Sequence, residues 1–243
     1  MKLTIVIPTY NEVENLPKLI PALFDLSLPE LNILVVDDGS PDGTGQIADE
    51  LASHQPKRLQ VMHREGKMGL GSAYIQGFQY ALKHGAQAVG QMDADFSHPV
   101  AKVIELVQAL ERADIAVGSR YIPGGSLDEN WPFWRKGLST WGNFYSRSIL
   151  RIPLHDMTGG FRLWRQNVLT SMPLERIRSN GYIFQVEMAY VAHRLGFKFF
   201  EVPIHFADRR WGKSKMSVRI QIEAAIRVWQ LPLIYRDLRP RQA

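Results

Sequence analysis

Two carboxylates stand two residues apart near the middle of the chain, at Asp93 and Asp95. They follow the apolar run 86–92, which is typical of a short buried strand that ends at a turn. Two negative charges held this close favour a neutralising cation or a cationic substrate. Mg²⁺ and Mn²⁺ accept carboxylate oxygens as ligands, and substrate phosphates often complete their coordination shell. A solvated acidic turn has the same pattern, so the spacing alone leaves both interpretations open.

Strand-like and helix-like segments alternate along the first half of the chain and would position these carboxylates. Apolar runs typical of buried strands occupy residues 3–8, 32–36, 59–63, 86–92 and 114–118. Helical spacing of apolar residues follows at 11–23, 42–53, 72–84 and 100–112. This order predicts an α/β domain with a mostly parallel sheet and helices on both faces. In such a sheet the ligand binds at the carboxyl ends of the strands.

Four polar clusters follow strands where this ligand site is expected, at 9–12, 37–40, 67–71 and 93–98. We therefore expect them to converge. The remaining chain predicts a loop at 123–132, a helix at 138–150, a strand beside 158–162, a helix at 184–195, a strand at 198–206, a cationic loop at 209–215 and an amphipathic helix at 218–235 interrupted at Pro232.

Length and composition set the class of protein. The 243 residues are 45% hydrophobic, which suits one globular domain. The absence of cysteine excludes disulfides and thiolate metal sites. We expect no signal peptide, because Met1 and Lys2 lead straight into a strand, and no apolar run approaches the roughly 18 residues that span a bilayer. The net charge of +5 favours an anionic partner, which phosphates, an acidic membrane surface or nucleic acid would all satisfy.

Two turns in the first half have a structural and a functional interpretation. The acidic turn 37–40 either caps the next helix through Ser40 or Asp42, or offers carboxylates to a ribose or a base. The turn Gly69-Leu70-Gly71 favours helix capping, although the close approach of a nucleotide also requires residues without side chains. Neither a phosphate-binding P-loop nor a serine nucleophile motif is present in the sequence.

Cationic residues are concentrated after the central carboxylates. Guanidinium groups bind phosphate in a bidentate manner, so these residues are candidates for an anionic substrate, while a solvated basic face is the plainer interpretation. They are Arg120, Arg135, Arg147, Arg151, Arg162 and Arg165, with four more cations in the loop 209–215. His98 and His155 lack metal-ligand spacing and are interpreted as turn residues.

Eight motifs occur together in one order. They are 7–12 (Ile-Pro-Thr-Tyr-Asn-Glu), 36–44, 69–74, 92–98, 118–121, 129–132, 159–162 and 212–215. In this combination the chain resembles the polyprenyl-phosphate (dolichol-phosphate) mannose synthases, within the inverting GT-A glycosyltransferases of family 2. The resemblance covers nearly the whole chain. It implies the GT-A nucleotide-diphospho-sugar transferase fold, a single α/β domain with a mostly parallel, Rossmann-like sheet flanked by helices.

The resemblance also implies roles for individual residues. The donor nucleotide would be held by Pro8, Tyr10, Glu12, Asp37, Asp38, Ala73, Met92 and Asp93. A divalent metal, Mg²⁺ or Mn²⁺, would be bound by Asp93, Asp95 and Ser97, although some relatives carry glutamine at the Ser97 position. The acceptor phosphate would be held by Arg120, Arg135, Ser139, Arg209 and Lys215. Asp95, Arg120 and Arg135 are the candidate catalytic residues, while Asp156 and Glu187 are expected to be structural or substrate-orienting.

The implied reaction transfers mannose from GDP-mannose to the phosphate of a polyprenyl phosphate. A phosphate monoester is largely dianionic at neutral pH, so no general base is expected. The alternatives are a UDP-glucose-dependent polyprenyl-phosphate glucosyltransferase or another family 2 transferase. A nucleic-acid-binding protein is the non-enzymatic alternative, and no known nucleic-acid module supports it.

The resemblance implies a catalytic domain over 1–217 and a C-terminal helix and tail over 218–243 that can work peripherally on the cytoplasmic face of a membrane. Ile222, Ile226, Trp229 and Leu233 recur at helical spacing, with Arg219 just before them and Arg227 among them. This pattern fits an interfacial helix and a helix packed on the core equally well. The sequence leaves open whether a separate subunit anchors the protein to a membrane.

Overall fold

A seven-stranded sheet forms the centre of the computed structural model, which describes residues 1–207 and 218–241. Its strands are β1 (Leu3–Thr9), β2 (Leu31–Asp37), β3 (Leu59–His63), β4 (Ala88–Gln91), β5 (Ile115–Ser119), β7 (Arg162–Arg165) and β8 (Phe199–Pro203). The spatial order is β3-β2-β1-β4-β7-β5-β8, and only β7 runs antiparallel to its neighbours. The mostly parallel sheet is therefore confirmed, and the five strands predicted in the first half lie within two residues of their expected ends.

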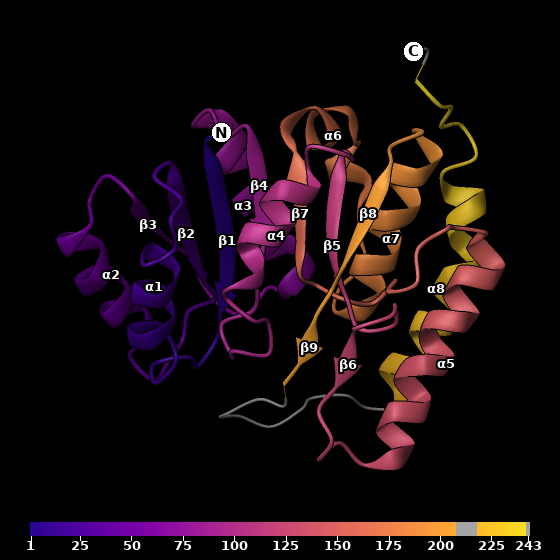
Figure 1. Ribbon diagram of the computed structural model, residues 1–243, viewed down its shortest axis with the longest axis horizontal. Helices are drawn as coiled ribbons and strands as arrows, with labels where there is room; N and C mark the ends of the chain where they lie inside the picture. The colour runs from indigo at the N-terminus through magenta and orange to yellow at the C-terminus, as the bar shows by residue number, and fades with distance from the viewer. Residues whose placement is uncertain (208–217, 242–243) are drawn as a thin grey trace.

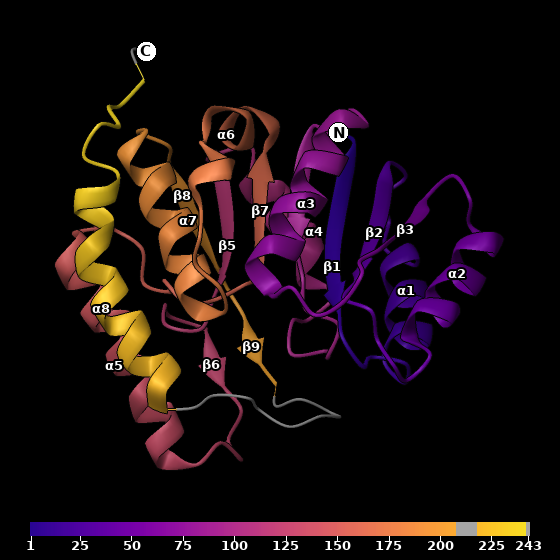
Figure 2. The ribbon, with the colours of Figure 1, turned by 180° about the vertical axis from the view of Figure 1, so that it is seen from behind.

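Helices cover both faces of this sheet (Figures 1 and 2). One face packs against α1 (Leu16–Phe24), α2 (Thr44–His54) and α4 (Lys102–Ala109). The other packs against α3 (Leu70–Lys83), α6 (Gln166–Ser171) and α7 (Tyr182–Arg194). Two buried clusters of Val, Ile, Leu and aromatic side chains fill the spaces between sheet and helices, so the strands are apolar on both sides as the sequence predicts.

Local sequence explains how β1 accommodates a proline and how closely α3 packs against it. Pro8 lies inside the strand, where its missing N–H costs little because pairing with β4 ends at Val6. Helix α3 crosses β1 at Gly77, where a Cβ atom would lie 2.4 Å from Cγ1 of Val6. Glycine therefore lets this helix approach the strand that carries the predicted site at its carboxyl end.

Two long helices lie side by side beyond α7, at the edge of the molecule (Figure 2). They are α5 (Phe133–Leu150) and α8 (Val218–Ile234). Helix α5 begins directly after Pro132, five residues before the predicted start at Leu138. Helix α8 continues two residues beyond Pro232 and is not interrupted there, since it ends at Ile234. Among the described residues, no helix combines the length and the apolar character needed to cross a membrane.

Short elements connect the sheet to these helices. The predicted strand 198–206 is divided at Ile204 into β8 and β9 (His205–Phe206), and β9 pairs with β6 (Ser126–Leu127) in the loop that the sequence predicts at 123–132. A 3₁₀ turn, η1 (Leu174–Arg176), follows α6. The two-stranded pair lies below the carboxyl end of β5 and leads the chain into α5 (Figure 1).

Candidate active site

A cleft of about 190 Å³ opens where β1, β2 and β4 end. Its lining combines residues from all four predicted clusters, so their convergence is confirmed. These residues are Pro8, Thr9, Tyr10, Glu12, Asp38, Lys67, Gly69, Leu70, Asp93, Ala94 and Asp95. A larger hollow of about 580 Å³ lies at the opposite, amino end of the sheet, between α4 and Arg165. It is far from the paired carboxylates, and we place the chemistry in the smaller cleft because open α/β sheets bind ligands there.

The turn after β4 holds the two central carboxylates on the cleft wall. Asp93 accepts a 3.1 Å hydrogen bond from the hydroxyl of Tyr74 on α3, and Asp95 accepts one of 3.1 Å from the backbone N–H of Ser97. Phe96, directly after Asp95, has a positive φ of 60°, which closes the turn tightly. Burial and the neighbouring Asp93 raise the pKa of Tyr74, so this phenol stays protonated and keeps donating.

His98 fixes the backbone of the same turn. Its Nδ1 accepts a 3.0 Å hydrogen bond from the Asp93 N–H, and its ring stacks on Phe161 with centroids 4.9 Å apart. Burial lowers the pKa of His98, which favours the neutral ring that this acceptor role requires. The sequence interpretation of a plain turn residue is therefore incomplete, because His98 orients the first of the two carboxylates.

A buried ion pair forms the wall opposite. Arg64 binds the carboxylate of Asp38 and donates to the hydroxyl of Ser72 at 2.6 Å. Both charged side chains are nearly fully buried. Sequence reasoning missed Arg64, because its partner lies 26 residues earlier and only the fold brings β2 and the end of β3 together.

The Gly69-Leu70-Gly71 turn begins α3 with Gly69 at the N-cap position, as the capping prediction expects, and it has a further structural role. A Cβ atom on Gly69 would lie 2.8 Å from the Asn180 amide oxygen, and one on Gly71 would lie 2.4 Å from the Ser179 carbonyl. These glycines therefore admit another part of the chain against the start of α3. Gly69 itself lines the cleft, so the segment 179–180 supports the cleft from behind.

The predicted donor-binding residues divide into two groups. Five line the cleft: Pro8, Tyr10, Glu12, Asp38 and Asp93. Tyr10 lies under the Lys67 ammonium, 4.3 Å from the ring centroid, so a cation and an aromatic ring face the cleft together.

Three predicted donor residues do not line the cleft. Ala73 and Met92 have no exposed surface and belong to the hydrophobic core, because each points between the sheet and its helices. The Asp37 carboxylate is occupied by Thr9 and by both the N–H and the hydroxyl of Ser40. Ser40 therefore closes a local turn and does not cap α2. The N-cap position of α2 is Gly43, and Asp42, one residue before it, accepts from the N–H of Thr44 at the start of the helix.

The carboxylate pair fits a divalent cation that takes further ligands from its substrate. Ser97, the third predicted ligand, is 1% exposed, and its hydroxyl has no hydrogen-bond partner within the described ranges. No group of three or more His, Asp or Glu side chains close enough to hold a metal occurs among the described residues. Two carboxylates with an open remainder are typical of Mg²⁺ and Mn²⁺ sites that are completed by phosphate oxygens.

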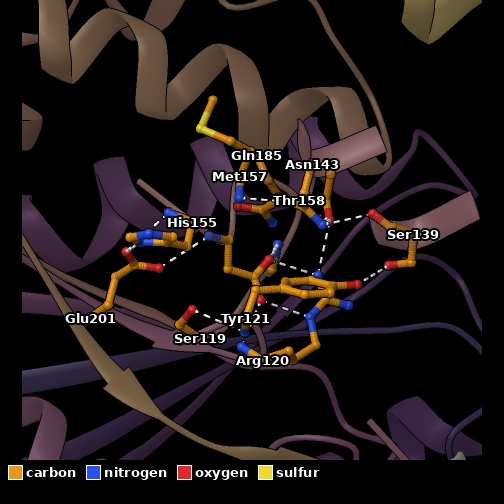
Figure 3. A network of polar contacts seen from close by, with 12 residues as sticks. Ser119, Arg120, Tyr121, Ser139, Asn143, His155, Met157, Thr158, Gln185 and Glu201 are labelled. Atoms are coloured by element: carbon orange, nitrogen blue, oxygen red, sulfur yellow. Dashed lines mark hydrogen bonds and ion pairs between the residues drawn. The ribbon is translucent and has the colours of Figure 1, made fainter. Parts of the chain in front are cut away.

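A second polar network lies at the carboxyl end of β5 (Figure 3). Arg120 follows β5 and donates through Nε and Nη2 to the two oxygens of Asp156, both at 2.7 Å. Nη2 also donates to the Thr158 hydroxyl at 2.8 Å. Burial would raise the pKa of Asp156, but the charge and hydrogen bonds of Arg120 outweigh it and lower that pKa. Arg120 is thus a fixed, compensated cation and not a free surface arginine.

Helix α5 provides the outer wall of this network. Ser139 accepts a 2.6 Å hydrogen bond from the Tyr121 hydroxyl, and Asn143 accepts the N–H groups of Met157 and Thr158 (Figure 3). Arg135, one turn before Ser139, places its guanidinium 3.7 Å from the centroid of the Trp131 ring. Aromatic rings connect the three predicted acceptor residues: Tyr121 contacts Arg120 and Ser139, and Phe206 and Trp131 link Arg120 to Arg135. None of the three lines the cleft itself.

Two other predicted cations, Arg162 and Arg165, do not share this position. Arg162 is completely buried and donates to the carbonyls of Gln185 and Met157, so it braces the core and cannot reach a phosphate. Arg165 binds carbonyls at the end of α4, at the amino end of the sheet. Arg209 and Lys215 lie outside the described residues. His155 pairs with Glu201, which also accepts the Asp156 N–H.

Known proteins share this sequence and this fold. The family model described as glycosyl transferase family 2 matches residues 4–172. A polyprenol monophosphomannose synthase of Mycolicibacterium smegmatis is 48% identical over 88% of this chain and 80% of its own. An undecaprenyl-phosphate mannosyltransferase of Micrococcus luteus is 44% identical over 99% of both chains.

Solved structures support the fold independently. A glucosyl-3-phosphoglycerate synthase of Mycobacterium tuberculosis, crystallised with Mn²⁺, UDP and glucosyl-3-phosphoglycerate, superposes with a TM-score of 0.65 over 99% of this chain and 81% of that one. Their sequence identity is 17%, so this likeness concerns the fold alone. The expected GT-A fold is confirmed. Together, the family match and the two relatives that share 44–48% of their residues with it show that the chain is a glycosyltransferase of family 2.

Proposed function

We propose that this enzyme transfers mannose from GDP-mannose to the phosphate of a polyprenyl phosphate, with inversion at the anomeric carbon. The observation that carries the proposal is the 44% identity to an undecaprenyl-phosphate mannosyltransferase over 99% of both chains. This match includes α5 and the polar network around Arg120 and Asp156, as well as the cleft. The geometry agrees, since paired carboxylates for a diphosphate lie beside cations for a second anion.

The donor occupies the cleft in this proposal. Its nucleoside lies between Tyr10 and Asp38, which line the cleft, and its diphosphate reaches the turn that carries Asp93 and Asp95. These two carboxylates would hold Mg²⁺ or Mn²⁺, which supplies positive charge for the GDP leaving group. Tyr74 and His98 keep the turn in place by binding the Asp93 carboxylate and backbone, respectively. Their contribution is preorganisation of the site before the donor binds.

The acceptor phosphate acts as the nucleophile. One of its oxygens forms a bond to the anomeric carbon while the bond from that carbon to the GDP oxygen breaks, and the electron pair leaves with GDP. A phosphate monoester has a second pKa of about 6, so it needs no general base at neutral pH. We assign Arg135, Ser139 and Arg120 to positioning this anion against another anion, with Arg209 and Lys215 as further candidates. Asp156 orients Arg120 and does not take up a proton.

The lipid tail of the acceptor requires a membrane, so we place the enzyme peripherally on the cytoplasmic face of one. Transfer of radiolabel from GDP-mannose and from UDP-glucose, each to a short polyprenyl phosphate, tests the proposal. We expect a mannolipid with GDP-mannose, stimulated by Mn²⁺ or Mg²⁺ and abolished by EDTA. Product from UDP-glucose alone would overturn the donor assignment, and product from neither would overturn the acceptor.

A further inference from the structure

We propose that the exposed sides of α5 and α8 form one docking surface for an anionic lipid bilayer. This aromatic face consists of Phe133, Trp134, Trp141, Phe144, Ile226, Trp229 and Leu233. The inference rests on the proposed function, because it explains how a lipid-linked phosphate reaches the site. It adds a defined surface, most of it contributed by α5, which the sequence pattern of α8 does not reveal.

Helix α5 contributes four large apolar side chains that no core residue covers. Their exposed fractions are 90% for Phe133, 68% for Trp134, 53% for Trp141 and 67% for Phe144. At about 100° per residue these positions fall within an arc of roughly 100°. Single exposed apolar residues are ordinary, but a stripe of four aromatic residues on one helix is not.

Helix α8 adds a second stripe and also packs on the core. Ile226, Trp229 and Leu233 are 55%, 61% and 72% exposed and fall within an arc of roughly 60°. The opposite side buries Val228, Leu231 and Tyr235 completely or nearly so. The interpretation of a helix packed on the core is therefore confirmed for one side, and the interfacial interpretation stays a prediction for the exposed side. The side chains of Ile222 and Arg219 lie outside the description.

Tyr145 joins the two stripes into a single surface. Its ring stacks on Trp141 with centroids 4.8 Å apart, and its hydroxyl accepts a 2.8 Å hydrogen bond from the Trp229 indole N–H. The same hydroxyl donates to the carbonyl of Ala225 on α8. The helices thus present their exposed aromatic residues side by side, in a fixed arrangement.

The inner side of α5 contacts the polar network around Arg120 and Asp156. Ser139 and Asn143, one turn apart, contact Tyr121 and Thr158 next to Arg120 (Figure 3). The aromatic face and the predicted acceptor site are therefore separated by the width of one helix. A bilayer resting on the aromatic face would bring phosphates at its surface to the level of that site.

Charge and residue type favour a bilayer over a protein partner as the occupant. Helix α5 has three basic residues, Arg135, Lys136 and Arg147, and no acidic one. The whole chain carries a net charge of +5. Tryptophan and phenylalanine beside basic residues are typical of helices that lie in a membrane interface, where anionic lipids add electrostatic attraction.

Vesicle sedimentation of the full chain tests the surface without using catalysis. The vesicles contain phosphatidylglycerol and phosphatidylethanolamine and no polyprenyl phosphate. The double variant Phe144→Ser with Leu233→Ser removes two exposed side chains for which no hydrogen bond or ring contact is described. Phe200→Ser is the matched control, because Phe200 is 38% exposed on the edge strand β8, away from the aromatic face. Circular dichroism verifies that all variants are folded.

We expect the double variant to lose on the order of tenfold in partition coefficient, and the control to bind like the wild type. Brominated lipids should quench wild-type tryptophan fluorescence and quench the double variant less. Equal sedimentation of the wild type and the double variant would overturn the proposal. A wild-type dimer that the double variant loses, without vesicle binding, would assign the face to a second copy and also overturn it. Vesicle binding by a chain that forms no mannolipid would sustain the surface and reject only the proposed function.

Discussion

The Arg120 guanidinium holds both oxygens of the Asp156 carboxylate, through Nε and Nη2, at 2.7 Å each. Both side chains are buried, and the Arg120 N–H donates to the same carboxylate at 3.0 Å. Asp156 also accepts the Gly159 N–H, which ties β5 to the glycine-rich segment before β7. The pair therefore fixes the end of β5 against the segment that leads into β7.

Replacing Asp156 with asparagine should destabilise the enzyme strongly. The substitution keeps the volume but leaves the buried Arg120 charge uncompensated, which typically costs about 3–5 kcal/mol. Urea unfolding followed by circular dichroism measures the free energy of unfolding. Asp237→Asn is the control, since Asp237 pairs with Arg176 on the surface and should change stability little. Equal losses in the two variants would contradict a special role for the buried pair.

The same pair predicts how stability depends on pH. Arg120 lowers the pKa of Asp156 below its ordinary value, against the effect of burial. The contribution of this carboxylate is therefore fully present above about pH 4, the unfolded value, and is lost as pH falls through the lower folded value. Urea midpoints measured between pH 3 and pH 7 should show a steeper acid loss for the wild type than for Asp156→Asn. Parallel profiles would show that the pair is not linked to acid unfolding.

Gly71→Ala should perturb the donor cleft. The added Cβ would lie 2.4 Å from the Ser179 carbonyl, so the start of α3 must shift at a cost of about 1–3 kcal/mol. We expect this shift to raise the KM for the nucleotide donor, because Gly69 in the same turn lines the cleft. Gly142→Ala on α5 is the matched control. Nothing lies within 4 Å of its Cβ, so helix propensity should stabilise the protein by about 0.5–1 kcal/mol.

The sequence predicts the framework well because periodicity and turns are local. Strands at 3–8 and 59–63 alternate with helical segments, and parallel pairing brings their carboxyl ends to one edge. That topology is sufficient to place Tyr10, Asp38 and Asp93 around one cleft. The insertion of β7 between β4 and β5 is harder to predict from sequence, because a strand of four residues contains no signal for antiparallel pairing.

Partners far apart in sequence account for what the motifs do not reveal. Arg64 meets Asp38 across β2 and β3, and Tyr74 reaches Asp93 from α3. Arg162 is a hydrophilic residue with no exposed surface, so composition places it wrongly on a basic face. Ala73 and Met92 are small or apolar residues next to site motifs, and only their burial shows that they belong to the core.

The most direct test of the central claim is mannosyl transfer from GDP-mannose to a short polyprenyl phosphate by the wild type, Asp95→Asn and Asp49→Asn, with Mn²⁺ or with EDTA. Asp49 is an exposed carboxylate on α2 that pairs with His63 and serves as the control. We predict metal-dependent transfer by the wild type and Asp49→Asn, and a loss of about 100-fold or more in kcat for Asp95→Asn. Undiminished, metal-dependent transfer by Asp95→Asn would contradict the assignment of this cleft as the catalytic site.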